Sequence, residues 1–161
     1  MNPITYSGPR LIIVCGLPGS GKTTHAREVT NQLRAVRLCP DEWLTSLSIN
    51  LHDEIKREKI EILQWKLGRE LLALGLVVVI EWGTWYRAER DALRLEARAL
   101  GAGVDLHYLC APVEVLFERI QHRALENSPI EYDSILEWSN QFQAPNQEEM
   151  ALYDAVFLSS E

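Results

Sequence analysis

The stretch GLPGSGKTTH, residues 16–25, follows directly on the apolar run LIIVC at residues 11–15. A continuous run of aliphatic and β-branched residues predicts a strand that is buried on both faces. The stretch itself fits the pattern G-x-x-x-x-G-K-[ST], in which a glycine-rich loop between a strand and a helix wraps a phosphate group. Because both the spacing and the strand–loop–helix setting are present, we expect a nucleotide phosphate-binding loop here.

Each residue type in this loop has a physical task. Glycines permit positive φ and a close approach of the backbone, so consecutive N–H groups can face phosphate oxygens, and the following helix adds the partial positive charge of its N-terminus. We expect Lys22 to reach the β- and γ-phosphates and Thr23 to offer its hydroxyl to Mg²⁺. The loop residues expected to bind the nucleotide are Gly16, Pro18, Gly19, Ser20, Gly21, Lys22, Thr23 and Thr24.

Strand-like and helix-like segments alternate along the rest of the chain. Further strands are expected at residues 35–38, 76–82, 104–110 and 154–158, and helices at 21–33, 52–74, 86–100, 112–123 and 131–142. Such alternation predicts a parallel sheet covered by helices on both faces. We expect an α/β, three-layer P-loop NTPase fold with five strands in the order 2-3-1-4-5. The length of 161 residues favours one domain over residues 1–161, with a small helical lid over about 112–142.

Composition and charge narrow the classes of partner. The net charge of −7 disfavours non-specific binding of nucleic acid, which usually needs a basic surface, although a local basic groove stays open. No apolar run reaches the ~18 residues that span a bilayer, and the first ten residues do not have the pattern of a signal peptide. Three widely spaced cysteines, Cys15, Cys39 and Cys110, fit reduced thiols. We therefore expect a cytoplasmic protein without a membrane partner.

The use of the phosphate separates three classes of protein. A GTPase switch needs a guanine-reading N-K-x-D motif, which does not occur in this sequence. A mechanical ATPase needs an apolar strand that ends in Asp or paired acids, and VVVIEW at residues 77–82 supplies only Glu81, so this class is weakened but open. A kinase needs an acid near the γ-phosphate and arginines that close over it.

The segment RLCPDEW, residues 37–43, supplies a suitable acid. Asp41 follows the second expected strand, and the carboxyl ends of parallel strands face the ligand crevice. We expect Asp41 to orient an acceptor hydroxyl or to take its proton. The alternative is that Asp41 caps the following helix, and the two roles are compatible.

Arg119 and Arg123 supply the cations, since residues four apart lie on one helix face. Two guanidinium groups on one face suit contact with phosphate oxygens as charge spreads over them in the transition state. The alternative is a solvated basic face. With Lys22 and Asp41, these arginines are the expected catalytic residues.

The segment EWGTWYRAER, residues 81–90, is the expected acceptor-binding loop because it follows the third expected strand. Its aromatic residues suit stacking on a ring or sugar, and its arginines suit an anionic group. A tryptophan-rich apolar plug is the alternative, and whether Glu81 serves Mg²⁺ or the substrate stays open. The expected acceptor contacts are Asp41, Glu81, Trp82, Thr84, Arg87 and Arg90.

In these features the chain resembles the small P-loop kinases, which include polynucleotide kinases, gluconate-type kinases, chloramphenicol phosphotransferase and zeta-toxin relatives. The resemblance implies transfer of the γ-phosphoryl group of ATP to a hydroxyl, with ATP and Mg²⁺ as cofactors and Arg119 as a further nucleotide contact. It also implies that the segment FQAPNQEEM, residues 142–150, contacts adenine, with Pro145 as the contact.

One departure from the family concerns the acceptor. Polynucleotide kinases of this type carry Asp-x-x-Arg after the second strand, whereas here Leu44 takes the place of the arginine. An aliphatic side chain makes no charge-assisted contact with a phosphate, so we expect a small-molecule acceptor. A polynucleotide 5′-hydroxyl kinase is the first alternative, since Arg87 or Arg90 could take over the contact. An ATP-binding or ATPase module that acts through a protein partner is the second.

Overall fold

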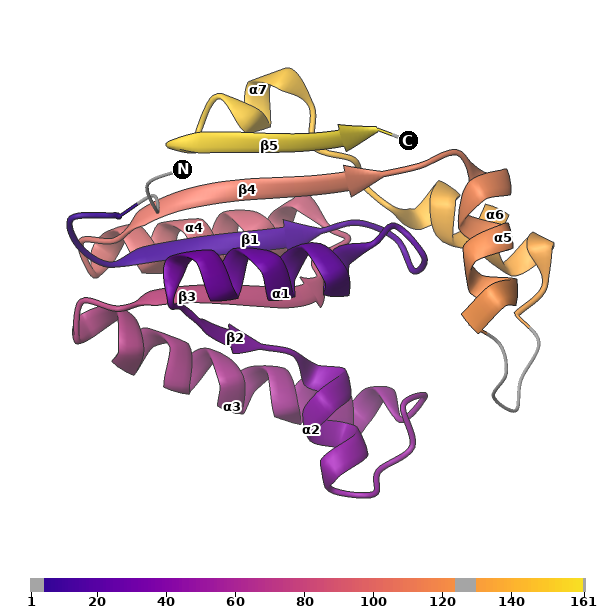
Figure 1. Cartoon of the computed structure of the whole chain (residues 1–161), viewed down its shortest axis with the longest axis horizontal. Coiled ribbons are helices and arrows are strands. Elements are labelled where there is room, and N and C mark those ends of the chain that lie inside the picture. Colours follow the sequence, from indigo (N-terminus) through magenta and orange to yellow (C-terminus); the bar gives the residue numbers. More distant parts are fainter. Residues whose placement is uncertain (1–4, 124–129, 161) are drawn as a thin grey trace.

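Five strands form one parallel sheet in the order β2-β3-β1-β4-β5, as expected (Figure 1). This computed structural model describes residues 5–123 and 130–160, so residues 124–129 of the expected lid and both ends of the expected domain lie outside it. The strands are β1 (Arg10–Cys15), β2 (Val36–Leu38), β3 (Val77–Gly83), β4 (Gly103–Cys110) and β5 (Ala155–Ser160).

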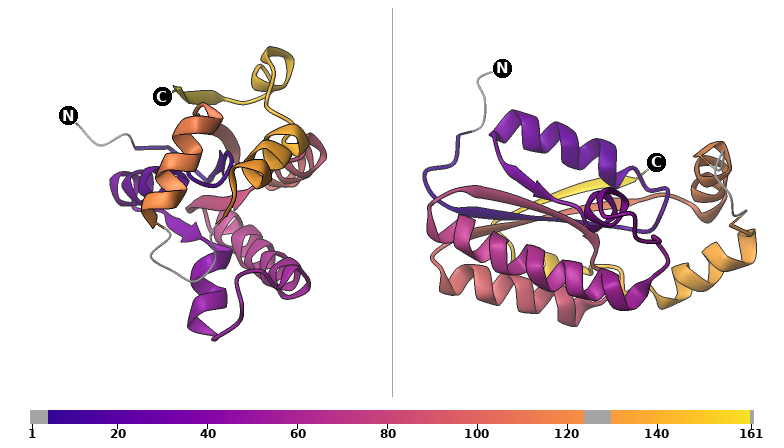
Figure 2. Two further views of the ribbon diagram at one scale, coloured as in Figure 1. Left: turned by 90° about the vertical axis from the view of Figure 1, so that its right-hand side faces the viewer. Right: turned by 90° about the horizontal axis from the view of Figure 1, so that it is seen from below.

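Helices connect these strands and cover both faces of the sheet. They are α1 (Lys22–Leu33), α2 (Pro40–Ser46), α3 (Glu54–Ala73), α4 (Arg87–Ala99), α5 (Val113–Arg123), α6 (Tyr132–Gln141) and α7 (Gln147–Met150). α1 lies on one face, and α3 and α4 lie on the other (Figure 2). The turn α7 interrupts the segment before β5, where the sequence pattern predicts no helix. Among the described residues, no helix is long and apolar enough to cross a membrane.

The alternation of side chains along β1 explains the two cores. Every residue from Leu11 to Cys15 is fully buried, because both faces of this central strand are covered. Leu11 and Ile13 pack toward α3 and α4, whereas Ile12 and Val14 pack toward α1. The expectation of a strand buried on both faces is confirmed.

All strands run in one direction, so their carboxyl ends meet at one edge of the sheet. The loop between β1 and α1 lies at this edge, and so do the start of α2 and the segment after β3. α5 and α6 stand beyond the same edge (Figure 1). The fold therefore brings four segments that are far apart in the sequence to one place.

Candidate active site

The loop between β1 and α1 depends on glycine at defined positions. Gly16, Gly19 and Gly21 have φ values of +151°, +83° and +92°, which side chains rarely tolerate. A Cβ atom on Gly16 would lie 2.3 Å from the carbonyl oxygen of Leu109, and one on Gly19 would lie 2.9 Å from that of Leu116. α1 begins immediately after the loop, at Lys22, so its N-terminus points its free N–H groups at this place. This arrangement is that of an anion-binding loop.

The side chain of Lys22 folds back onto this loop and is held by a backbone carbonyl group. Its ammonium donates to the carbonyl oxygen of Leu17 at 3.0 Å. Burial lowers the pKa of Lys22 to about 8, and the nearby carboxylates of Glu81 and Asp41 raise it only in part. A phosphate would supply the negative charge that this buried cation lacks.

Thr23 and Glu81 form the oxygen-rich side of the loop. The Thr23 hydroxyl donates to one carboxylate oxygen of Glu81, and Arg37 donates to the other at 2.6 Å. Glu81 is 7% exposed, at the end of β3. A hydroxyl and a carboxylate are hard oxygen donors that suit Mg²⁺, which usually takes few protein ligands besides water and phosphate oxygens. The described residues include no group of three or more histidine, cysteine or acidic side chains that could hold a metal ion.

Asp41 lies in the first turn of α2, which begins at Pro40 with Cys39 as its N-cap residue. Asp41 is therefore not the N-cap residue of this helix, because Cys39 holds that position. The Asp41 carboxylate accepts a hydrogen bond from Arg57 of α3 and faces the same cleft as Lys22. Sequence reasoning missed Arg57, because 16 residues separate it from Asp41 and only the packing of α3 beside α2 brings them together.

The two arginines of α5 both reach the phosphate-binding loop. Arg119 donates to the carbonyl oxygen of Gly19 at 3.3 Å. Arg123, one turn later, lines the cleft and is close enough to Lys22 to lower its pKa. The face of α5 that carries them packs on Gly19 through Leu116 and Ile120. Arg119 therefore contacts the loop and Arg123 lines the cleft beside Lys22, and their contact with a nucleotide phosphate stays a prediction.

A cleft of about 1000 Å³ opens from the loop toward α3 and α4. Trp82 and Thr84 line it as expected, together with Asp41 and Glu81. Five of the residues expected to bind the nucleotide also line the cleft: Pro18, Gly19, Gly21, Lys22 and Thr23. Further side chains of α3 and α4, none of them among the expected acceptor contacts, also line it: Glu61, Trp65, Glu89 and Glu96.

The two arginines of α4 that were expected to contact the acceptor, Arg87 and Arg90, do not line this cleft. Arg90 is fully buried, and its guanidinium binds both oxygens of Glu149 at 2.6 and 2.9 Å and the carbonyl oxygens of Thr84 and Gln143, each at 2.7 Å. Arg87 pairs with Asp91 at 3.3 Å and lies 3.8 Å from Glu148. The structure therefore does not bring Arg87 or Arg90 together with the expected acceptor contacts that line the cleft.

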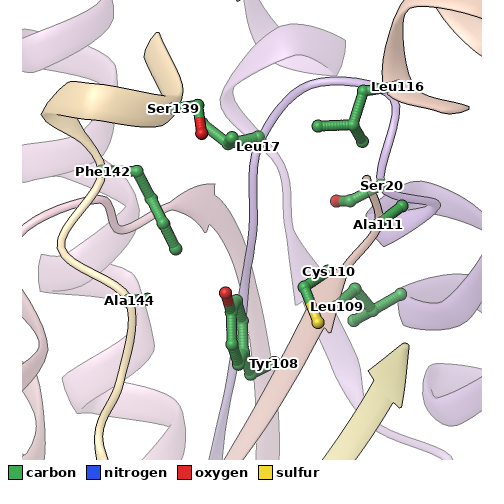
Figure 3. Close-up of a pocket in the computed structure, with 10 residues that line it drawn as sticks. All are labelled: Leu17, Ser20, Tyr108, Leu109, Cys110, Ala111, Leu116, Ser139, Phe142 and Ala144. Atoms are coloured by element: carbon green, nitrogen blue, oxygen red, sulfur yellow. The ribbon is translucent and has the colours of Figure 1, made fainter. Parts of the chain in front are cut away.

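Five of the expected nucleotide contacts do not line the cleft: Gly16, Ser20, Thr24, Arg119 and Pro145. Thr24 is exposed on α1, and Pro145 is buried in the segment before α7. Ser20 lies behind the loop in a second, smaller cavity of about 140 Å³. Figure 3 shows Ser20 and Leu17 of the loop on one side of this cavity and Tyr108 and Phe142 opposite them. Phe142 stacks on Tyr108 at 5.8 Å, so this part of the expected adenine segment packs on β4.

The comparisons with known proteins agree with this geometry. The family model described as the AAA domain matches residues 11–145. No curated protein matches the chain in sequence. Solved structures do match: Chaetomium thermophilum Kti12 in complex with ADP-AlF3 has a TM-score of 0.71 at 19% identity, over 93% of this chain and 88% of that chain.

Two further structures carry kinase or RNA-repair names. A gluconokinase from Sinorhizobium meliloti 1021 has a TM-score of 0.61 at 22% identity, over 94% of this chain and 82% of that chain. A chain of the Pnkp1/Rnl/Hen1 RNA repair complex has a TM-score of 0.70 at 23% identity, over 92% of this chain and 47% of that chain. These similarities confirm the P-loop kinase-like fold that the sequence predicts.

Proposed function

The chain belongs to the AAA domain family of P-loop proteins, and on this premise we propose that it is an ATP-dependent kinase that phosphorylates a hydroxyl of a small molecule. The observation that carries the proposal is the position of Asp41. Its carboxylate lines the same cleft as Lys22 and Thr23, between the phosphate-binding loop and the wall formed by α3 and α4. An acid between a nucleotide phosphate and a second binding region is what phosphoryl transfer to an acceptor requires.

In the proposed reaction the acceptor oxygen forms a bond to the γ-phosphorus, and the bond from that phosphorus to the β–γ bridging oxygen breaks. Asp41 orients the acceptor hydroxyl and takes its proton. Lys22 holds the β- and γ-phosphates, and Arg119 and Arg123 stabilise the charge that spreads over the transferring group. Thr23 and Glu81 would hold Mg²⁺, which, when bound, neutralises charge on the phosphate oxygens.

The small-molecule class of acceptor is supported by Leu44 and by the many acidic side chains that line the cleft. Leu44 is fully buried against the fold, so it offers nothing to an acceptor phosphate. One observation favours a polynucleotide 5′-hydroxyl instead: Arg57 lines the cleft next to Asp41, where a substrate phosphate could bind it. Arg57 is, however, already paired with Asp41.

The compartment is part of the same proposal. Cys15, Cys39 and Cys110 are free thiols, and Cys15 and Cys39 are buried. Free cysteines of this kind are typical of a reducing compartment. We propose that the protein acts in the cytoplasm, where ATP and Mg²⁺ are supplied.

The test is a transfer screen with ATP labelled on the γ-phosphate. The acceptors are nucleosides, RNA 5′-hydroxyl ends, sugars, and aminoglycoside and phenicol antibiotics. We expect a labelled small molecule. With that acceptor, Asp41→Asn should lower kcat by about 10²- to 10⁴-fold, the usual effect of losing a general base, while ATP still binds. The matched control is Asp133→Asn, which changes an exposed acid on α6.

Two results would contradict the proposal. A labelled RNA end in place of a small molecule would favour the polynucleotide class. ATP hydrolysis that Asp41→Asn leaves unchanged, with no labelled acceptor, would favour an ATPase module that acts through a protein partner.

A further inference from the structure

The part of the cleft formed by α3 and α4 is both acidic and aromatic. It is formed by side chains of α3, β3 and α4, and we call it the acidic wall: Glu61, Trp65, Trp82, Glu89 and Glu96. The two tryptophan rings meet edge to face at 6.4 Å. Their N–H groups fix them, since Trp65 donates to Glu96 at 2.5 Å and Trp82 donates to the buried Gln64 at 2.9 Å.

The negative charge of the acidic wall is only weakly balanced within the protein. Among residues 5–123 and 130–160, no salt bridge within 4.0 Å reaches Glu61 or Glu89, and Glu96 lies 3.7 Å from Arg69. Three cations line the cleft. Lys22 begins α1 and Arg123 ends α5 near it, whereas Arg57 acts on Glu61 but is already paired with Asp41.

Glu61 shows the energetic consequence of this imbalance. The pKa of Glu61 is raised to about 7: partial burial in the cleft wall is the largest cause, Arg57 opposes it, and the charges of Glu89, Glu58 and Asp41 add to it. A carboxylate that is costly to ionise in the empty cleft gains from any ligand that brings a positive charge to it.

A second, independent feature of the cleft also indicates a ligand. Thr84 is 4% exposed and lines the cleft, beside the buried Cys15 thiol. Within the described part of the chain its hydroxyl makes no hydrogen bond to nitrogen or oxygen. A buried hydroxyl without such a partner costs free energy, which a polar group of a bound acceptor would recover.

We infer that the acceptor is an amino alcohol: its hydroxyl lies at Asp41, and a protonated amine on the same molecule lies at the acidic wall. This inference rests on the proposed kinase function and names its substrate class. The ammonium would pair with the unbalanced carboxylates and lie near the tryptophan rings, which attract cations through their π electrons. The same carboxylates would repel a phosphorylated acceptor such as a polynucleotide end.

The experiment compares acceptors that carry a positive charge with acetylated forms of the same molecules that do not. Amino sugars, aminocyclitols and simple amino alcohols are each offered to the intact protein with labelled ATP, beside their N-acetylated forms, which keep the hydroxyls and lose the cation. We expect transfer to a free amine, with kcat/KM at least about 10-fold lower for its N-acetylated form, an effect of the size of one charge-assisted hydrogen bond.

Variants of the acidic wall then locate the effect. Glu61→Gln and Glu89→Gln should each raise KM for the amine about 10-fold, leave KM for ATP unchanged and not affect the N-acetylated form. The matched control is Glu70→Gln, which changes an exposed acid on the same helix as Glu61. Because Gln keeps the shape of Glu, a thermal unfolding scan of each variant verifies that the fold is retained.

The outcomes separate the inference from the proposed function. Transfer that is equal or better with neutral or anionic acceptors would overturn the inference and leave the kinase standing. Binding of ATP without transfer to any acceptor, charged or neutral, would overturn both. A loss of amine transfer in Glu70→Gln as large as in Glu61→Gln would also overturn the inference, because the effect would then not belong to the acidic wall.

Discussion

At the scale of single residues, the site contains ionisable side chains whose pKa values are shifted toward the neutral form in the protein without ligand. Lys22 is a partly buried cation with a lowered pKa, and Glu61 is a partly buried acid with a raised one. They lie in the same cleft but at different walls, one at the phosphate-binding loop and one on α3. This separation gives the cleft a cationic end for phosphate and an anionic end for the acceptor.

The pKa of Lys22 predicts a pH dependence of nucleotide binding. The phosphates bind the ammonium form, and in the free protein that form is lost as the pH rises through about 8. We therefore expect the Kd for ATP to increase steadily between pH 8 and pH 10, by up to about tenfold per pH unit. Isothermal titration calorimetry at fixed salt measures it. Lys22→Arg, whose side chain stays charged throughout, should show a flat profile over this range, and a wild-type profile as flat as that of the variant would contradict the assignment.

At the scale of elements, the contact between α5 and the phosphate-binding loop matters most. α5 lies against Gly19 so closely that a Cβ atom there would be 2.9 Å from the Leu116 carbonyl oxygen and 3.1 Å from Ile120. This contact is what places Arg119 and Arg123 over the loop. The sequence spacing set the two arginines on one face of the helix, and the glycine allows that face to approach.

Gly19→Ala tests this contact. The new methyl group would strain the backbone at φ +83° and also push α5 away, so we expect a loss of about 2–4 kcal/mol in the free energy of unfolding, together with weaker ATP binding. Gly75→Ala is the matched control, because Gly75 has a similar φ of +85° but open space around it. Its expected cost is about 1–2 kcal/mol, from the backbone alone. Urea unfolding measures both, and equal losses would show that the approach of α5 is not tight.

A second element contact, between α1, β4 and β5, predicts how stability changes in acid. His25 and His107 share a hydrogen bond of 2.8 Å beside Phe157, and burial lowers the pKa of His107 from 6.5 to about 4. Between pH 6.5 and pH 4 the unfolded chain takes up a proton that the folded protein does not. The free energy of unfolding therefore falls over this window, by up to about 3 kcal/mol from this group.

His107→Asn should remove this part of the pH dependence. The measurement is urea unfolding at pH 7 and at pH 4.5, with His122→Asn, an exposed histidine on α5, as control. We expect the wild type and the control to lose more stability in acid than His107→Asn does. A parallel loss in all three proteins would contradict the prediction.

At the scale of the whole molecule, a buried ion pair joins the C-terminal part of the chain to α4. Arg90 is 0% and Glu149 1% exposed. The guanidinium of Arg90 also donates to the carbonyl oxygens of Thr84, which follows β3, and of Gln143, which precedes α7. The acceptor side of the cleft is therefore anchored to the segment before β5. A long-range pair of this kind orders the molecule around the site without touching the substrate.

Replacing one partner of this pair should be costly. Arg90→Met leaves the Glu149 carboxylate buried without its cation, so we expect a loss of about 3–5 kcal/mol in the free energy of unfolding. The double variant with Glu149→Leu should regain part of this loss, because neither charge is then left alone. Denaturant unfolding of the single and double variants measures the coupling. Additive losses would show that the two side chains act independently.

The sequence by itself determined the five strands, the five longer helices α1, α3, α4, α5 and α6, the buried central strand and the phosphate-binding loop, because each of these is encoded by local spacing; the short helices α2 and α7 were not among the expected elements. A hydrophobic period of two or of 3.6 residues can be read from neighbouring residues alone. The same holds for the glycines of the phosphate-binding loop and for the lysine in the first turn of the helix after it.

Only the tertiary structure decided which side chains share the cleft. Arg57 beside Asp41, the acidic wall on α3 and α4, and the withdrawal of Arg90 into the interior all depend on which helix packs against which strand. Arg90 and Arg123 are both helical arginines near an expected site, yet one is buried against Glu149 and the other faces Lys22. Burial and the nearest opposite charge decide the role of such a residue, and both are properties of the folded chain.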